Sequence, residues 1–282
     1  MNPAGKTALV TGANSGLGKA ITRALAAAGA HVFMLVRDQA RGQAARAEIA
    51  AATGNQQLEV IVCDLARQRD IHQASAAIHS RVDALHLLVN NAGTAFRDHG
   101  LTEDGIERTL AVDHLAPFLL TKLLLDRLQA EPPARIVNVG TRYDTRMVLD
   151  DLNWQRRRYR MLPAYGQAKL GNIHFTRELA RRLAGSGVTV NCVFPGVFRS
   201  NLGGTDDAQG PFWRAVALLL GWALPSAEQA AQRVMYVLTD AEVATTSGLY
   251  FGDRKPLEPP AQAQDPNINA EVWRLSETLV QR

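Results

Sequence analysis

Tyr165 and Lys169 are the two residues whose types and spacing best suit proton transfer. They lie four positions apart in a stretch of helical composition, and on a helix this spacing places the phenol and the ammonium on one face. A free tyrosine has a pKa of about 10, and a neighbouring cation lowers that pKa by stabilising the phenolate. We therefore expect Tyr165 to act as general acid/base and Lys169 to tune it.

A turn with three glycines near the N-terminus is the second feature that could do chemistry. It follows an apolar run at residues 6–10 and precedes an Ala- and Leu-rich run at residues 19–28. A strand that turns sharply into a helix collects free N–H groups and the positive helix end at one point, where a pyrophosphate binds well. The glycines suit the turn, the close approach of phosphate and tight helix–strand packing. The expected cofactor-binding residues here are Gly12, Ser15, Gly16, Leu17 and Gly18.

These features need elements to position them, and the chain alternates strand-like and helix-like runs throughout. Strand-like runs occur at residues 7–10, 31–36, 58–63, 85–89, 135–139, 188–194 and 248–251. Runs of helical composition and length lie between them. This alternation predicts an α/β fold, a single-domain Rossmann-type, doubly wound parallel sheet with helices on both faces. One dinucleotide-binding domain is expected to span residues 1–282.

The end of the second strand-like run bears on which cofactor binds. An acid there would hold the adenosine ribose, whereas an arginine favours a 2′-phosphate. Val36 occupies the expected acid position and Arg37 follows it. We therefore expect NADP(H) rather than NAD(H). The alternative is that Arg37 is a solvated loop charge and Asp38 caps the next helix.

Two further strand ends carry polar turns. Asp64 and Leu65 follow the third run, and Asn91, Ala92 and Gly93 follow the fourth. Ligands of open α/β sheets bind at the carboxyl ends of the strands. The acid is expected to accept from an adenine amino group and the Asn-Ala-Gly turn to lie against a ribose. Taken alone, each is also an ordinary turn.

With these motifs in order, the chain resembles the short-chain dehydrogenase/reductase family over nearly its whole length. It is most similar to the retinol-dehydrogenase-like branch. The resemblance implies an oxidoreductase that uses NADP, preferring NADPH over NADH, and interconverts a hydrophobic alcohol and its aldehyde or ketone. It also implies that the loop at Pro195, Gly196, Phe198 and Ser200 positions the nicotinamide. Further motifs that carry the resemblance are the stretches at residues 113–121 and 248–251.

Two positions depart from the family pattern. Thr141 stands where the family has a serine that holds the substrate carbonyl, and it keeps the hydroxyl but adds a methyl group. Asp113 stands where the family has an asparagine that positions a proton-relay water. Its carboxylate can accept from Lys169 or become protonated when desolvated. The alternatives are therefore non-redox chemistry (elimination, isomerisation or cyclisation) with retained cofactor, or a non-catalytic dinucleotide-binding protein.

Two segments are candidates for substrate contact. Four arginines at residues 156–160 suit an anionic substrate or a solvated loop face. Residues 200–225 contain an apolar run that the resemblance makes a lid over a small hydrophobic substrate; the alternatives are a core helix or peripheral membrane contact. A Pro-rich C-terminal tail, residues 255–282, ends in an amphipathic helix.

Composition narrows the function classes. The net charge is +4 and aromatic residues make up 6% of the chain, so no nucleic-acid partner is expected. We expect no metal, no transmembrane segment, and two cysteines that are small buried residues of a cytoplasmic protein. The resemblance further implies a homodimer or higher homo-oligomer, formed through the helices at residues 115–129 and 165–184.

Overall fold

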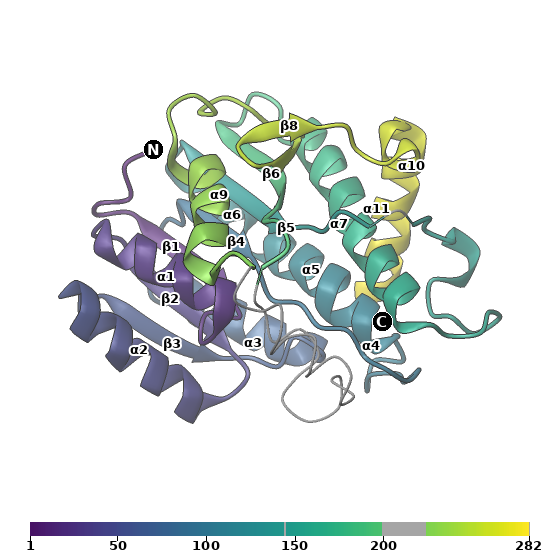
Figure 1. Ribbon diagram of the computed structural model, residues 1–282, viewed down its shortest axis with the longest axis horizontal. Helices are drawn as coiled ribbons and strands as arrows, with labels where there is room; N and C mark the ends of the chain where they lie inside the picture. Colours follow the sequence, from purple (N-terminus) through teal and green to yellow (C-terminus); the bar gives the residue numbers. More distant parts are fainter. Residues whose placement is uncertain (144, 199–223, 282) are drawn as a thin grey trace.

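The computed structural model describes residues 1–143, 145–198 and 224–281, and an eight-stranded sheet runs through it (Figure 1). The strand order is β3-β2-β1-β4-β5-β6-β7-β8. All neighbours are parallel except β7 and β8. The order reverses between β1 and β4, and ligands of open sheets bind at such a switch point. The strands are β1 (Thr7–Thr11), β2 (His31–Val36), β3 (Leu58–Val62), β4 (Leu87–Asn90), β5 (Ala134–Val139), β6 (Val188–Phe194), β7 (Tyr250–Gly252) and β8 (Lys255–Leu257).

The central strands are apolar along their whole length because both faces of the sheet are covered. In β1, Leu9 contributes to one hydrophobic core, whereas Ala8 and Val10 contribute to the core on the opposite face. Side chains alternate between faces with a period of two, so a strand buried on both sides needs apolar residues at successive positions. The predicted doubly wound sheet is confirmed.

Helices cover each face of the sheet. On one side lie α1 (Gly16–Ala27), α2 (Gln39–Thr53) and α9 (Ala227–Thr239). The other side carries α3 (Gln68–His79), the π-helical turn η1 (Ala111–Leu115), α5 (Ala116–Leu123), α7 (Met161–Arg182) and α11 (Pro266–Val280). Shorter helical elements are α4 (Arg108–Leu110), α6 (Leu125–Ala130), the 3-10 turn η2 (Leu149–Asp151) and α10 (Ala261–Gln264).

Several elements differ from the sequence prediction, and three of the differences have a physical reason or change the element itself. Helix α7 begins at Met161 rather than at residue 165, since Pro163 falls in the first turn, where its missing N–H costs no hydrogen bond. The single helix predicted at residues 115–129 is instead η1, α5 and α6 in succession. Strand β8 was unexpected in the Pro-rich tail. It pairs through a two-residue turn, Asp253 and Arg254, with φ of 48° and 64°. Asp suits the first position of such a turn, but the second usually holds glycine.

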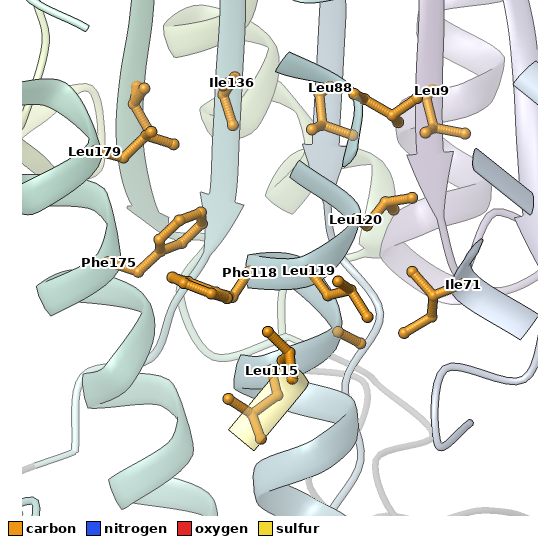
Figure 2. Packing of buried hydrophobic residues seen from close by; sticks show 14 of the residues in the cluster. Leu9, Ile71, Leu88, Leu115, Phe118, Leu119, Leu120, Ile136, Phe175 and Leu179 are labelled. Carbon is orange, nitrogen blue, oxygen red and sulfur yellow. The ribbon is translucent and has the colours of Figure 1, made fainter. Parts of the chain in front are cut away.

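The C-terminal helix α11 lies against α7 and α5. Figure 1 shows α11 beside α7. Trp273 of α11 packs edge-on against Phe118 of α5, with ring centroids 4.9 Å apart. Phe118 in turn meets Phe175 of α7 at 5.3 Å, and Figure 2 shows these two rings side by side below the sheet. Lys122 and Glu277 form an ion pair of 2.6 Å at the edge of this contact. Helix α11 thus covers the α5–α7 face at which the resemblance places a dimer contact.

Three further sequence predictions concern the lid, membrane spans and the cysteines. The predicted lid at residues 200–225 lies outside the described residues except for its last two positions. In the described part of the chain, no helix combines the length and apolar character needed to cross a bilayer. Cys63 and Cys192 are buried thiols, as expected.

Candidate active site

The glycine turn joins β1 to α1 and leaves the start of that helix open. Gly12 and Gly16 adopt φ of 65° and 50°, which favour glycine. A Cβ on Gly18 would lie 2.2 Å from the Gly12 carbonyl oxygen, so helix and strand pack too closely for any side chain. Within the described residues, Ser15 makes no side-chain bond to the first turn of α1. The N–H groups of this turn are therefore available to an anionic group.

A cleft of about 830 Å³ runs from this turn across the carboxyl ends of the strands. It brings together nearly all residues that the sequence predicted for cofactor and catalysis. Those lining the cleft are Gly12, Ser15, Gly16, Leu17, Gly18, Arg37, Asp64, Leu65, Asn91, Ala92, Gly93, Thr141, Tyr165, Lys169, Pro195, Gly196 and Phe198. Of the other two predicted residues, Asp113 is fully buried beside Gly93 and Lys169. Ser200 lies outside the described residues.

Tyr165 and Lys169 face the same cleft from α7, with the Lys169 Nζ 5.8 Å from the centre of the Tyr165 ring. Burial raises the pKa of Tyr165 above its usual value; Lys169 and Thr141 lower it, and Asp113 raises it. Lys169 therefore acts in the predicted direction, but burial and the carboxylate outweigh it. The phenol stays protonated at neutral pH.

Asp113 holds the lysine from behind the cleft. Its Oδ2 lies 3.2 Å from Lys169 Nζ, and the side-chain exposures are 0% and 4%. The second carboxylate oxygen accepts a 2.7 Å hydrogen bond from the backbone N–H of Thr94. Burial raises the pKa of Asp113 to about 6, although Lys169 and the Thr94 amide lower it. Burial opposes the charge on Lys169, but Asp113 and Tyr165 raise its pKa above the usual value. We refer to these two residues as the Asp113–Lys169 pair.

The turn after β4 is fixed by Thr11 at the end of β1. The Thr11 hydroxyl accepts 2.9 Å hydrogen bonds from the N–H groups of Asn91 and Ala92. The Asn91 side chain donates to the Thr11 carbonyl oxygen at 2.8 Å. Asn91 thus binds the protein's own backbone, which leaves Ala92 and Gly93 as the backbone surface of the cleft. A Cβ on Gly93 would come within 2.8 Å of Lys169 Nζ, so a side chain at this position would have to displace the lysine ammonium.

The region after β2 contains one residue that the sequence prediction missed. Arg37 lines the cleft, and so does Arg41 in the first turn of α2. Asp38 caps that helix by accepting a hydrogen bond from the Arg41 N–H at 2.8 Å. The helix cap at Asp38 and a place for Arg37 in the cleft, which the sequence analysis gave as alternatives, therefore occur together. The signal for Arg41 was its place in the first turn of a helix that begins at the cleft, because side chains on a helix tilt toward its N-terminus.

Asp64 lines the cleft after β3, with Oδ1 accepting from the Ala66 N–H at 3.0 Å. At the opposite end, Arg233 of α9 donates to the Pro195 carbonyl oxygen at 3.0 Å. Gly196 follows with a φ of 88°. Both loops are therefore held in shape by contacts within the protein.

The arginine-rich loop is partly structural. Arg157 packs over the Trp154 ring at 3.8 Å and forms an ion pair of 2.9 Å with Asp151. Arg156 pairs with Asp150 at 3.2 Å. Two of the four arginines thus form ion pairs with acidic residues of the same loop. This pairing argues against the hypothesis that the segment attracts an anionic substrate.

Comparisons with known proteins agree with this geometry. Residues 6–209 match the family model described as short chain dehydrogenase. Human retinol dehydrogenase 13 is 40% identical over 280 residues, which is 98% of this chain and 85% of that protein. Mouse retinol dehydrogenase 14 is 39% identical over 290 residues, with 98% and 86% covered.

One solved structure, of an uncharacterized protein from Mycobacterium paratuberculosis, has a TM-score of 0.80 at 33% identity and covers 99% of this chain and 94% of its own. The Pseudomonas aeruginosa RhlG/NADP active-site complex has a TM-score of 0.69 at 26% identity, with 90% and 98% covered. The chain therefore belongs to the short-chain dehydrogenase family, and its relatives include the retinol dehydrogenases.

Proposed function

We propose that this protein is an NADP(H)-dependent oxidoreductase that interconverts a hydrophobic alcohol and its aldehyde or ketone. The observation that carries the proposal is that Tyr165, Lys169 and Thr141 line one cleft with the glycine turn. A proton donor, a cation and a hydroxyl thus share one cleft with the open N-terminus of α1. The relatives named as retinol dehydrogenases support a hydrophobic substrate for this chain as well.

The residues present fit a dinucleotide. The open first turn of α1 and the glycine contacts at positions 12 and 18 suit a pyrophosphate. Arg37 and Arg41 suit a 2′-phosphate, because both are exposed residues that line the cleft. Neither guanidinium has a hydrogen-bond or ion-pair partner among residues 1–143, 145–198 and 224–281. When bound, NADP(H) would supply or accept the hydride.

In the reduction direction, Tyr165 would give its hydroxyl proton to the carbonyl oxygen, and Thr141 would donate a hydrogen bond to that same oxygen. Lys169 would stabilise the phenolate that remains. The raised pKa of Tyr165 keeps the phenol protonated at neutral pH, which is the form that reduction requires.

A second candidate function is dinucleotide binding without efficient hydride transfer. The protein would then either catalyse a non-redox reaction with the cofactor retained or have no catalytic activity. The observation behind it is the Asp113 carboxylate, which holds Lys169 and raises the pKa of Tyr165. For this candidate, NADPH would raise the melting temperature, while its absorbance would stay constant with every carbonyl compound tried.

The test follows NADPH absorbance with a panel of apolar aldehydes and ketones that includes retinal. The variant Tyr165→Phe should lower kcat by about 10²–10⁴-fold and leave thermal stabilisation by NADPH in place. Tyr236→Phe is the matched control, since that tyrosine is on α9 and its hydroxyl contacts Glu242. Turnover by Tyr165→Phe at the wild-type rate would refute the assignment.

A further inference from the structure

We propose that the C-terminal helix α11 positions the Asp113–Lys169 pair through a buried chain of hydrogen bonds formed by Ser276, His114 and Asn172. These would be positioning residues that act through Asp113. The inference rests on the proposed function, because it concerns how the same site is held in place.

The first link is the main-chain carbonyl of Asp113. In a regular helix this oxygen would accept from the N–H four residues later, but that residue is Pro117, which has no N–H. The segment Ala111–Leu115 is wound as a π-helical turn. The Asn172 side chain of α7 donates to the Asp113 carbonyl oxygen at 2.8 Å. A side chain from another helix thus replaces a donor that the sequence removes.

The second link is His114, which fixes the orientation of Asn172. Because the Asn172 amide nitrogen faces the Asp113 carbonyl, its Oδ1 faces His114 Nδ1, at 3.4 Å. Burial lowers the pKa of His114 to about 4, so the imidazole is neutral and has one donor and one acceptor. Since Oδ1 can only accept, Nδ1 carries the hydrogen and Nε2 is left as an acceptor.

The third link is Ser276 of α11. Its Oγ lies 2.8 Å from His114 Nε2 and 2.7 Å from the carbonyl oxygen of Val272. The hydroxyl hydrogen therefore has two acceptors within reach, one of them on the π-helical turn of the candidate site. The sequence separation between Ser276 and His114 is 162 residues, so only folding brings α11 to this turn.

The packing around His114 leaves the ring little freedom. A Cβ on Gly171 would lie 2.7 Å from the His114 Nδ1 atom, so the imidazole lies directly against the backbone of α7. Asn172, His114 and Ser276 are 1%, 1% and 2% exposed. Without water to compete, each bond in such a chain constrains the next, and removing one leaves its partner unsatisfied.

The site would respond at Asp113. With Ser276 removed, His114 Nε2 loses the hydroxyl that it faces, Asn172 loses its orientation, and the Asp113 carbonyl loses its replacement donor. The Asp113 carboxylate would then no longer be held in a fixed position relative to Lys169 and the Thr94 N–H. Lys169 would face Tyr165 less consistently, and the chemical step should slow more than substrate binding weakens.

The test compares Ser276→Ala with Thr278→Ala. The Thr278 hydroxyl bonds to the carbonyl four residues earlier on the same helix, at 3.0 Å, but is exposed. Both variants remove a hydroxyl that contacts the carbonyl oxygen four residues earlier on α11, and only the Ser276 hydroxyl also lies against His114 Nε2. We expect Ser276→Ala to lower kcat about tenfold with little change in the KM for NADPH, and Thr278→Ala to match the wild type.

A double-variant cycle and hydrogen exchange follow the path itself. Because the effect passes through Asn172, Ser276→Ala should have no further effect on kcat in an Asn172→Ala background. Exchange of the Thr94 amide, which bonds to Asp113, should speed up in Ser276→Ala but not in Thr278→Ala. Additive losses of kcat in the Ser276→Ala/Asn172→Ala cycle would overturn the inference. So would equal kcat values and equal Thr94 exchange rates in Ser276→Ala and Thr278→Ala.

The two proposals can fail separately. If Tyr165→Phe abolishes turnover while Ser276→Ala behaves as Thr278→Ala does, only the role of α11 is wrong. If Tyr165→Phe keeps wild-type turnover, the proposed function is wrong. The exchange measurement at Thr94 still reports on the hydrogen-bond chain in that case, because it does not depend on activity.

Discussion

The carboxylate of Asp113 and the ammonium of Lys169 lie 3.2 Å apart, with both side chains almost completely buried. The pair places a negative charge next to the cation that would otherwise act mainly on Tyr165. As a result Lys169 lowers the pKa of Tyr165 while Asp113 raises it. The electrostatic balance of the site is thus set by three residues rather than two.

Asp113→Asn should change the pH dependence of alcohol oxidation. The substitution removes a charge that raises the pKa of Tyr165 and keeps an oxygen to accept from the Thr94 N–H. Because oxidation needs the phenolate, the limb of the pH profile on which the rate rises with pH should move to lower pH. Initial rates of NADP⁺ reduction across pH would measure this. Asp126→Asn, on an exposed acid of α6, is the control, and an unmoved limb in Asp113→Asn would contradict the prediction.

The free energy of unfolding should depend on pH through the Asp113 carboxyl. Its pKa is raised from 3.8 to about 6 in the folded state, so between these values the folded state binds more protons than the unfolded state. The contribution of Asp113 to the free energy of unfolding should therefore fall as pH rises from about 4 to about 6. The fall is on the order of 3 kcal/mol.

This term can be isolated by urea denaturation of the wild type and of Asp113→Asn at several pH values. The stability of the wild type relative to the variant should decrease with rising pH across that window. A relative stability that increases with pH would mean that the carboxyl has a lowered pKa in the folded protein.

The two arginines after β2 should set cofactor preference. Replacing Arg37 or Arg41 by alanine removes a cation that lines the cleft, and each loss should raise the KM for NADPH about tenfold, since a charge-assisted hydrogen bond contributes roughly 1.5 kcal/mol or more. The KM for NADH, which has no 2′-phosphate, should stay near the wild-type value. Arg23→Ala, on an exposed arginine of α1, is the control. Parallel rises for both cofactors would argue against a 2′-phosphate contact.

Gly18 and Gly16 should respond differently to alanine. A Cβ at Gly18 would lie 2.2 Å from a backbone oxygen, whereas nothing lies within 4 Å of a Cβ at Gly16. Gly18→Ala must therefore shift α1 away from β1, and it should abolish thermal stabilisation by NADPH and lower the melting temperature. In apo protein Gly16→Ala should cost only the strain of its positive φ, about 1 kcal/mol. Differential scanning fluorimetry with and without NADPH would compare them; equal melting temperatures for the two apo variants would contradict the geometry.

The sequence by itself determined the doubly wound sheet and most of the cleft. Apolar runs such as residues 31–36 and helical stretches between them follow from local periodicity, and the glycine turn follows from backbone conformations that only glycine adopts easily. Because the carboxyl ends of parallel strands lie at one edge of a sheet, the sequence already implied that the polar turns after β3 and β4 lie at the same edge.

Only the tertiary structure decided what each side chain meets. The sequence could not place α11 over α5 and α7, link Ser276 to His114, or show that burial raises the pKa of Tyr165 and Asp113. It could not show the β7–β8 hairpin either, since Arg254 stands at the second turn position, where the positive φ favours glycine. Contacts between residues far apart in the chain, and the desolvation they cause, depend on packing rather than on local pattern.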